Sequence, residues 1–230
     1  FSAIFSLYCI FFLVNYWNAD VNYALGYNYQ QINEFSQANP YLEKAVAMRG
    51  GEDLYKNELS VNLAALSIGF AQQKDVKNTT LYATRAKELS DNVSQRNTNN
   101  VVYWKTRTRV MFSLAQLNPV FINDAIASIE KSHQLATSDA KITYNQALIY
   151  DQAGQKDKAM ASINETIKLK PNYRDAYYAK ALFLSAMIEK EEKNSPKILG
   201  YKKEAKDALN FILQNILPND EQSKNLLKSL

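Results

Sequence analysis

The stretch from residue 140 to residue 173 has the length and spacing of one complete helix-turn-helix unit. Its first half carries Ala147 on the packing face of a helix, and Gly154 then breaks that helix. Its second half places Ala159 and Ile163 four residues apart, on one face of a second helix. Two antiparallel helices approach closely only where neither side chain is large, so the two alanines mark the expected crossing. Such a unit cannot bury its apolar faces alone, and the chain should carry further copies.

The rest of the chain does repeat this pattern. Five hairpins are expected, at residues 19–52, 53–100, 101–139, 140–173 and 174–219, within an array that covers residues 18–219. The positions that correspond to Ala147 hold Gly26, Thr108 and Ala181, which are all small enough for a close helix crossing. Residues 220–230 should form a terminal capping helix.

The pattern and the composition together predict an all-α fold. Glycine and proline are scarce, with 6 and 5 residues in a chain of 230, and no stretch alternates like a strand between hairpin signals. Stacked helical hairpins form an elongated α-solenoid with one continuous core. The expected fold is therefore a right-handed α-solenoid of about five hairpins, preceded by an apolar helix.

Residues 140–173 resemble a tetratricopeptide repeat, which is a 34-residue unit. The residues that carry the resemblance stand at the spacing of that family and are Ala147, Tyr150, Gly154, Ala159 and Pro171. Thr143 stands where an aromatic residue is usual, and Gln146 where leucine is usual. The resemblance implies a repeat array that mediates interactions with other proteins.

Residues 1–17 contain no charged residue, no proline and no glycine. At a rise of 1.5 Å per residue they would cover roughly 25 Å of a hydrocarbon core that is about 30 Å thick. We expect the C-terminal part of a transmembrane helix, with Tyr16 and Trp17 in the interfacial aromatic belt. A signal peptide would require basic residues before the apolar run and a small-residue cleavage site after it. A buried core helix would not need to be apolar on all sides. Both remain alternatives.

The residues after the apolar segment predict its orientation and its junction with the repeats. Between Asn18 and Glu43 there is no lysine or arginine, so the repeats should lie on the non-cytoplasmic side of a bacterial cytoplasmic membrane. Nothing between Trp17 and Leu25 breaks a helix. We therefore expect the spanning helix to continue without interruption into the first repeat helix.

Several local features carry their own expectations. Pro40 should fall near the start of a helix, where its missing N–H matters little. Residues 71–80 and 94–100 are polar enough to be surface loops. Glu58 should be an ordinary acid on a helix surface.

No pattern in the chain points to catalysis, to a metal or to a cofactor. His133 is the only histidine and Cys9 the only cysteine, so neither a metal site nor a nucleophile–base pair has the partners that it needs. The net charge of +4 comes from interleaved acidic and basic residues, which argues against nucleic acid as a partner. We expect a chain without enzymatic activity.

A binding surface is expected on the first helices of the hairpins, at positions offset from the packing face, because these positions line the concave groove of such arrays. The candidate residues are Tyr23, Tyr27, Asn57, Lys105, Arg109, Tyr144, Asp151 and Tyr178. Tyrosine rings mixed with polar groups suit a protein or peptide partner, and a glycan is the second class that they would suit. The alternative is that tyrosine is simply frequent in this chain, at 15 of 230 residues.

The junction of the apolar helix with the first repeat, YWNADVNYALGYNYQQINEF, and the later LKPNYRDAYYAKA are similar to the C-terminal part of bacterial O-antigen ligase or polymerase-like membrane proteins. The resemblance implies a parent protein that transfers lipid-linked glycans outside the cytoplasmic membrane, with its catalytic residues in an upstream external loop. It implies that the present chain is a non-catalytic external module of that parent. The alternative is a single-span adaptor of the cell envelope with no enzyme attached.

Overall fold

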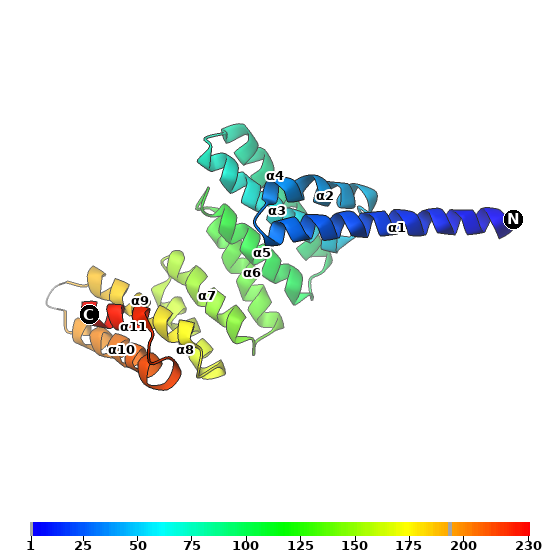
Figure 1. Ribbon diagram of the computed structural model, residues 1–230. Coiled ribbons are helices and arrows are strands. Elements are labelled where there is room, and N and C mark those ends of the chain that lie inside the picture. The colour runs from blue at the N-terminus through cyan, green and yellow to red at the C-terminus, as the bar shows by residue number, and fades with distance from the viewer. Residues whose placement is uncertain (1, 193–194) are drawn as a thin grey trace. The chain divides into compact units, whose positions relative to one another are not determined.

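The computed structural model describes residues 2–192 and 195–230, and within them every regular element is a helix (Figure 1). The helices are α1 (Ser2–Gln31), α2 (Phe35–Met48), α3 (Asp53–Gln72), α4 (Val76–Arg96), α5 (Val101–Leu114), α6 (Phe121–Leu135), α7 (Ala140–Gln152), α8 (Lys156–Leu169), α9 (Arg174–Lys190), α10 (Lys197–Phe211), the π-helical turn η1 (Ile212–Ile216) and α11 (Glu221–Ser229). The chain divides into two compact units, Phe1–Ser128 (unit 1) and Ile129–Leu230 (unit 2). The all-α expectation is confirmed.

Consecutive helices pair as hairpins. In unit 1, α1 packs on α2 and α3 packs on α4, while in unit 2 α7 packs on α8 and α9 packs on α10. The small residues expected at the crossings are buried: Ala147 and Ala181 have no exposed surface, and Thr108 is 6% exposed. At the α1–α2 crossing, a Cβ atom on Gly26 would lie 2.6 Å from Cγ of Leu42. The two helices can therefore touch there only because Gly26 has no side chain.

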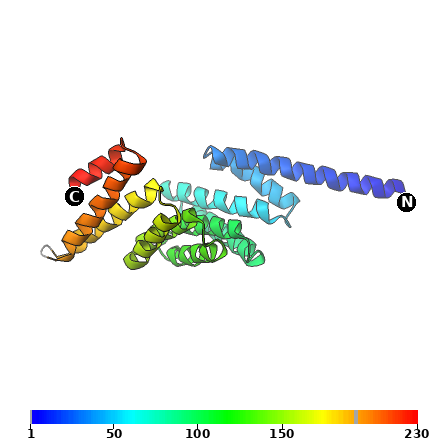
Figure 2. The ribbon, with the colours of Figure 1, turned by 90° about the horizontal axis from the view of Figure 1, so that it is seen from below.

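Helix α1 is the longest element, with 30 residues, and it passes through the predicted junction without interruption. Its C-terminal half packs in unit 1, where Ala19 is fully buried beside Tyr55 of α3. Its N-terminal half continues beyond the other helices of unit 1 (Figures 1 and 2). The apolar segment and the first repeat helix are thus one rigid element.

Three of the hairpins use the same turn between their two helices. In each turn the middle residue has a positive φ, and the next N–H closes the turn by donating to a carbonyl five residues earlier. The middle residues are Asn33 (63°), Lys74 (62°) and Gly154 (75°). The closing bonds, of 2.8 or 2.9 Å, run from Glu34 to Tyr29, from Asp75 to Phe70 and from Gln155 to Tyr150. This left-handed position favours glycine and tolerates asparagine, whereas a residue such as lysine occupies it at a cost of about 1 kcal/mol.

The structure corrects three local expectations. Residues 71–80 are not a loop, because α3 ends at Gln72, α4 begins at Val76, and Asp75 caps α4 by accepting a 3.0 Å bond from the N–H of Asn78. Of residues 94–100, the first three belong to α4. Pro40 is the sixth residue of α2 and not part of its first turn. The bond that it cannot donate would have reached the carbonyl of Ser36, which is exposed and can be solvated.

A buried arginine joins the helices of the third hairpin to α4. Arg107 of α5 is 9% exposed, and its Nε and Nη2 donate to Oδ1 of Asp91 on α4 at 2.9 and 2.7 Å. Its Nη1 donates to the carbonyl of Asp124 on α6 at 3.1 Å and to the hydroxyl of Ser128. One guanidinium therefore supplies polar contacts among three helices of unit 1.

The terminal helix α11 is attached to α9 through its cap. Asp220 is 5% exposed, and its carboxylate accepts bonds from the N–H groups of Gln222 and Ser223 at the start of α11. The same carboxylate pairs with Arg174 of α9, at 2.6 Å from Nε and 2.9 Å from Nη2. The hydrogen bond from Arg174 is the main cause that lowers the pKa of Asp220 to about 2.

The low pKa of Asp220 predicts an acid-sensitive attachment of α11. Because the folded-state pKa lies below the usual value of 3.8, this carboxylate stabilises the fold above about pH 4, and the contribution disappears as the pH falls toward 2. Asp220→Asn, which keeps a capping oxygen, should therefore cost about 2 kcal/mol near pH 7 and almost nothing near pH 2. Hydrogen exchange of residues 221–229 measures the effect. Glu221→Gln is the control, since the Glu221–Lys224 pair is a surface pair and should contribute under about 1 kcal/mol.

Candidate functional site

In unit 1, the predicted tyrosines of α1 form a stack with a tyrosine of α3. The rings of Tyr23 and Tyr27, one helical turn apart, have centroids 6.1 Å apart, and the ring of Tyr23 stacks on Tyr55 at 5.0 Å. Burial, followed by the nearby carboxylate of Glu58, raises the pKa of Tyr23 to about 12. The hydroxyl of Tyr23 therefore stays neutral at physiological pH and can both donate and accept a hydrogen bond.

Next to this stack lies a buried carboxyl that the sequence analysis misjudged. Glu58 of α3 is 8% exposed and accepts a hydrogen bond from Nε2 of Gln30 on α1, so it is not a surface acid. Burial raises the pKa of Glu58, although Arg109 and the bond from Gln30 act in the opposite direction. Oε1 of Gln30 is buried and finds no hydrogen-bond partner in the described part of the chain.

The other three predicted residues of unit 1 lie on α3 and α5. Lys105 and Arg109 are exposed on α5, and Arg109 is near enough to Glu58 to influence its pKa. Asn57 is 5% exposed, and its Nδ2 donates to Oγ1 of Thr106 at 3.2 Å. Asn57 therefore acts mainly as a link between α3 and α5. The residues that the structure brings together here are Tyr23, Tyr27 and Glu58, with Arg109 nearby.

In unit 2, a second aromatic group lies at the start of α9. The ring of Tyr144 on α7 packs against Tyr173 with centroids 5.2 Å apart, and the guanidinium of Arg174 lies 4.5 Å from the ring centre of Tyr178. Burial and then the Asp175 carboxylate raise the pKa of Tyr144. Tyr144 and Tyr178 thus flank Tyr173 and Arg174, two residues that the sequence analysis did not select.

The remaining predicted residue of unit 2, Asp151, is engaged within its own hairpin. Its carboxylate is bonded to Nζ of Lys156, which lies just beyond the α7–α8 turn. Asp151 is half-buried, and its charge is already paired.

The residues that sequence reasoning missed could have been found from helical spacing. Tyr55, Glu58 and Asn62 recur at three- and four-residue intervals, and all three are buried on the face of α3 that packs in unit 1. Their polar character hid this pattern. Arg174 has no such signal, because it begins α9 and owes its position to Asp220.

The side chains do not form a catalytic or metal-binding arrangement in the residues that the structure describes. Among them, no group of three or more His, Cys, Asp and Glu side chains could hold a metal ion. His133 is half-buried, with Nδ1 3.4 Å from the hydroxyl of Thr143 and Nε2 3.7 Å from Glu165. What both units offer chemically is a surface of tyrosine rings with polar neighbours.

Comparison with known proteins supports the repeat assignment. The family model of the tetratricopeptide repeat matches residues 19–50 and 140–173, which are the first and fourth expected hairpins. Similar solved structures include a thermophilic TPR protein from Thermus thermophilus, with 15% identity, a TM-score of 0.59, and coverage of 92% of this chain and 97% of that one. MamA from Desulfovibrio magneticus has 14% identity and a TM-score of 0.63, over 86% of this chain and 97% of its own.

A third similar structure is YrrB, which is described as a TPR protein with an unusual peptide-binding site. It has 14% identity and a TM-score of 0.54, over 89% of each chain. None of the curated proteins matches the sequence significantly. The tetratricopeptide-like α-solenoid expected from the sequence is confirmed.

Proposed function

We propose that this chain is a membrane-tethered, extracytoplasmic repeat module that binds a protein segment on the first-helix surfaces of its two units. The observation that carries the proposal is the packing of tyrosines on or next to these helices. In unit 1, Tyr23 stacks on Tyr27 and Tyr55, and in unit 2 Tyr144 packs on Tyr173 while Tyr178 packs on Arg174. Tyrosine offers a large, rigid contact area and a hydroxyl at low entropic cost, which suits peptide recognition. Peptide binding is also described for YrrB.

The exposure of α1 supports the membrane part of the proposal. Residues 4–31 of α1 are long and apolar enough to cross a bilayer, and only 6% of their most apolar window is buried. Large apolar side chains such as Phe5, Phe11 and Leu13 are 66 to 71% exposed. A core helix would bury these side chains against its own protein, so the exposure argues against that alternative. The absence of lysine and arginine between Asn18 and Glu43 supports the non-cytoplasmic side for the repeats.

The resemblance at the junction of α1 and the first repeat supports a parent protein of the O-antigen ligase or polymerase-like kind. In that setting the module would bring a protein partner, or the glycan substrate itself, to an enzyme in the same membrane. The second candidate is a single-span adaptor that assembles proteins of the cell envelope. The gene upstream of Phe1 separates the two, because several further spanning segments favour the ligase-like parent and a nearby start codon favours the adaptor.

The binding surface is tested by removing tyrosines in unit 2. An array of random peptides and a glycan array, each probed with the purified chain, identify which class is bound. Tyr144→Ala combined with Tyr178→Ala should weaken binding to the selected peptides about tenfold or more, because buried aromatic anchors dominate such interfaces. The matched control is Tyr201→Ala on α10, a half-buried tyrosine on a second helix. Unchanged binding by the double variant would refute the assigned surface, and binding to glycans alone would favour the second ligand class.

A further inference from the structure

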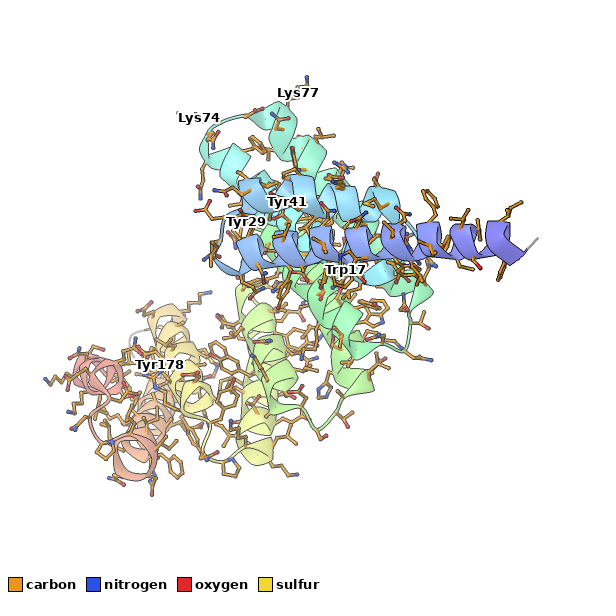
Figure 3. All side chains as sticks on the ribbon, turned by 45° about the vertical axis from the view of Figure 1, so that its right-hand side comes forward. Trp17, Tyr29, Tyr41, Lys74, Lys77 and Tyr178 are labelled. Atoms are coloured by element: carbon orange, nitrogen blue, oxygen red, sulfur yellow. The ribbon has the colours of Figure 1, made fainter. Side chains whose placement is uncertain are left out.

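The geometry of unit 1 places one of its edges at the level where α1 would leave a bilayer. The loop between α2 and α3 (residues 49–52), the loop between α4 and α5 (residues 97–100), and the first residues of α3 and α5 lie on the side toward which α1 extends (Figures 1 and 2). We call this set the proximal edge. The turns within the hairpins lie at the other end, which we call the distal edge, and there Figure 3 shows Lys74 and Lys77.

Specific contacts set the height of the proximal edge along α1. The hydroxyl of Tyr16 donates to Oε1 of Glu52 at 3.3 Å, and the guanidinium of Arg49 lies over the ring of Tyr16 and 5.7 Å from the ring centre of Phe12. One turn further along α1, Asp20 accepts a hydrogen bond from the hydroxyl of Tyr55. The proximal edge is therefore held against residues 12–20 of α1.

Two ion pairs and an amide contact lie within the proximal edge, in the α2–α3 loop and between the start of α3 and the end of α4. Asp53 at the start of α3 pairs with Arg96 at 3.0 Å and accepts a 2.7 Å bond from Nδ2 of Asn97. Arg49 pairs with Glu52 at 3.0 Å. These charges thus neutralise one another within the edge. Outside them, Leu54 and Val102 are 45% and 57% exposed, and Trp17 on α1 is 70% exposed.

We propose that the proximal edge of unit 1 rests in the headgroup zone of the bilayer, with Trp17, Leu54 and Val102 in contact with lipid. The inference rests on the proposed function, because it requires α1 to span the membrane. If α1 is inserted up to Tyr16 and Trp17, the contacts of Phe12, Tyr16 and Asp20 with the proximal edge hold that edge at the membrane surface. The paired charges cost little to bring to the interface, and tryptophan prefers that zone. Zwitterionic lipid suffices, because the contact is apolar.

The distal edge supplies the matched control. Val76 is 75% exposed, so it is as apolar and as accessible as Leu54 and Val102. It follows the α3–α4 turn, which corresponds to the α1–α2 turn at residues 32–34. That turn lies about 20 Å along the helix axis from Trp17, at 1.5 Å per residue. A membrane contact that follows from position must include Leu54 and Val102 and exclude Val76.

The test measures the depth of single labels on the full chain in phosphatidylcholine nanodiscs. Cys9 is the only cysteine, so it carries one nitroxide on α1, and Cys9→Ser gives a background for Leu54→Cys, Val102→Cys and Val76→Cys. Each label is tested by its collision rates with oxygen, which concentrates in lipid, and with a water-soluble nickel complex. We expect the label at Cys9 in hydrocarbon, the labels at 54 and 102 at headgroup depth, and several-fold higher nickel accessibility for the label at 76.

Two outcomes would overturn the inference, and they differ in what else they refute. If the label at Cys9 lies in hydrocarbon while the labels at 54 and 102 are as accessible to nickel as the label at 76, the proximal edge stands clear of the membrane and the tether remains. If the label at Cys9 is itself accessible to nickel, the tether fails, and the edge contact fails with it.

Discussion

Replacing Gly26 by leucine should force α1 and α2 apart and destabilise the first hairpin by about 4 kcal/mol. A Cβ at this position already lies 2.6 Å from Cγ, 2.8 Å from Cδ2 and 3.1 Å from the backbone nitrogen of Leu42. Leu42 has no exposed surface, so its side chain has nowhere to move without displacing its neighbours. Thermal unfolding of the chain in detergent micelles, followed by circular dichroism, measures the loss.

The controls for Gly26 separate the clash from general effects of glycine. Gly26→Ala should cost about 2 kcal/mol in spite of the better helix propensity of alanine. Gly69→Ala, in α3, should instead stabilise by up to about 1 kcal/mol, because a Cβ there meets nothing within 4 Å. Leu42→Ala should cost less in the Gly26→Ala background than in the natural chain, because it makes room for the added methyl group. Equal effects of alanine at positions 26 and 69 would contradict the close crossing.

Removing the guanidinium of Arg107 is expected to cost about 3 kcal/mol, the second-largest effect. Arg107→Met keeps much of the side-chain volume but removes both guanidinium hydrogen bonds to Asp91 and the one to Ser128. Arg107→Lys should lose about 2 kcal/mol, because one ammonium cannot reach Asp91, Ser128 and the carbonyl of Asp124 together. Urea unfolding of the same micelle-bound protein gives these values.

Two variants make the interpretation of Arg107 specific. Lys44→Met changes an exposed cation on α2 of the same unit and should shift the free energy of unfolding by less than about 0.5 kcal/mol. Asp91→Leu added to Arg107→Met removes the carboxylate that has lost the guanidinium and keeps Lys87 as its partner, so Asp91→Leu should cost less in this background than on its own. If Asp91→Leu cost as much in the Arg107→Met background as in the natural chain, the proposed coupling between Arg107 and Asp91 would be wrong.

The helices themselves could be predicted because their signals are local. One pair of α-helices falls in each of the five expected ranges, although α1 begins before its range and the last range also contains η1. The crossing residues were readable from a single comparison: Gly26, Ala147 and Ala181 stand at one repeat position, and a close approach allows only small side chains there. The continuity of α1 followed in the same way from the lack of any helix breaker near its junction.

The misjudged parts arose where tertiary structure overrides local preference. Lys74 occupies the left-handed turn position that Gly154 occupies in the fourth hairpin. Because no glycine marks the α3–α4 turn, the sequence did not show where α3 ends and α4 begins, and the polar residues around Lys74 were predicted to be one long loop. The signal that would have identified this turn is an aromatic pair on either side of it. The ring centroids of Phe70 and Tyr82 lie 5.1 Å apart, and those of Tyr29 and Tyr41, around the α1–α2 turn, lie 5.7 Å apart. Both pairs are twelve residues apart in the sequence.

The candidate surface was predicted by position but not in its chemistry. Repeat geometry placed Tyr23, Tyr27, Tyr144 and Tyr178 on first helices. The first three do pack against aromatic rings, while Tyr178 packs against the guanidinium of Arg174. Spacing alone could not show that Glu58 would be buried there with a raised pKa, because that shift depends on α1, α3 and α5 meeting around it.

The uninterrupted α1 has a consequence for any ligand of unit 1. Tyr23 and Tyr27 stand 6 and 10 residues after Trp17 on the same rigid rod, which is about 9 and 15 Å of helix rise. A partner bound to these rings would be held at a fixed distance from Trp17 along the helix axis and at a fixed orientation around that axis. A flexible linker would fix neither. One residue inserted into α1 between Trp17 and Tyr23 would rotate the bound partner by about 100° around the helix axis and move it about 1.5 Å along that axis.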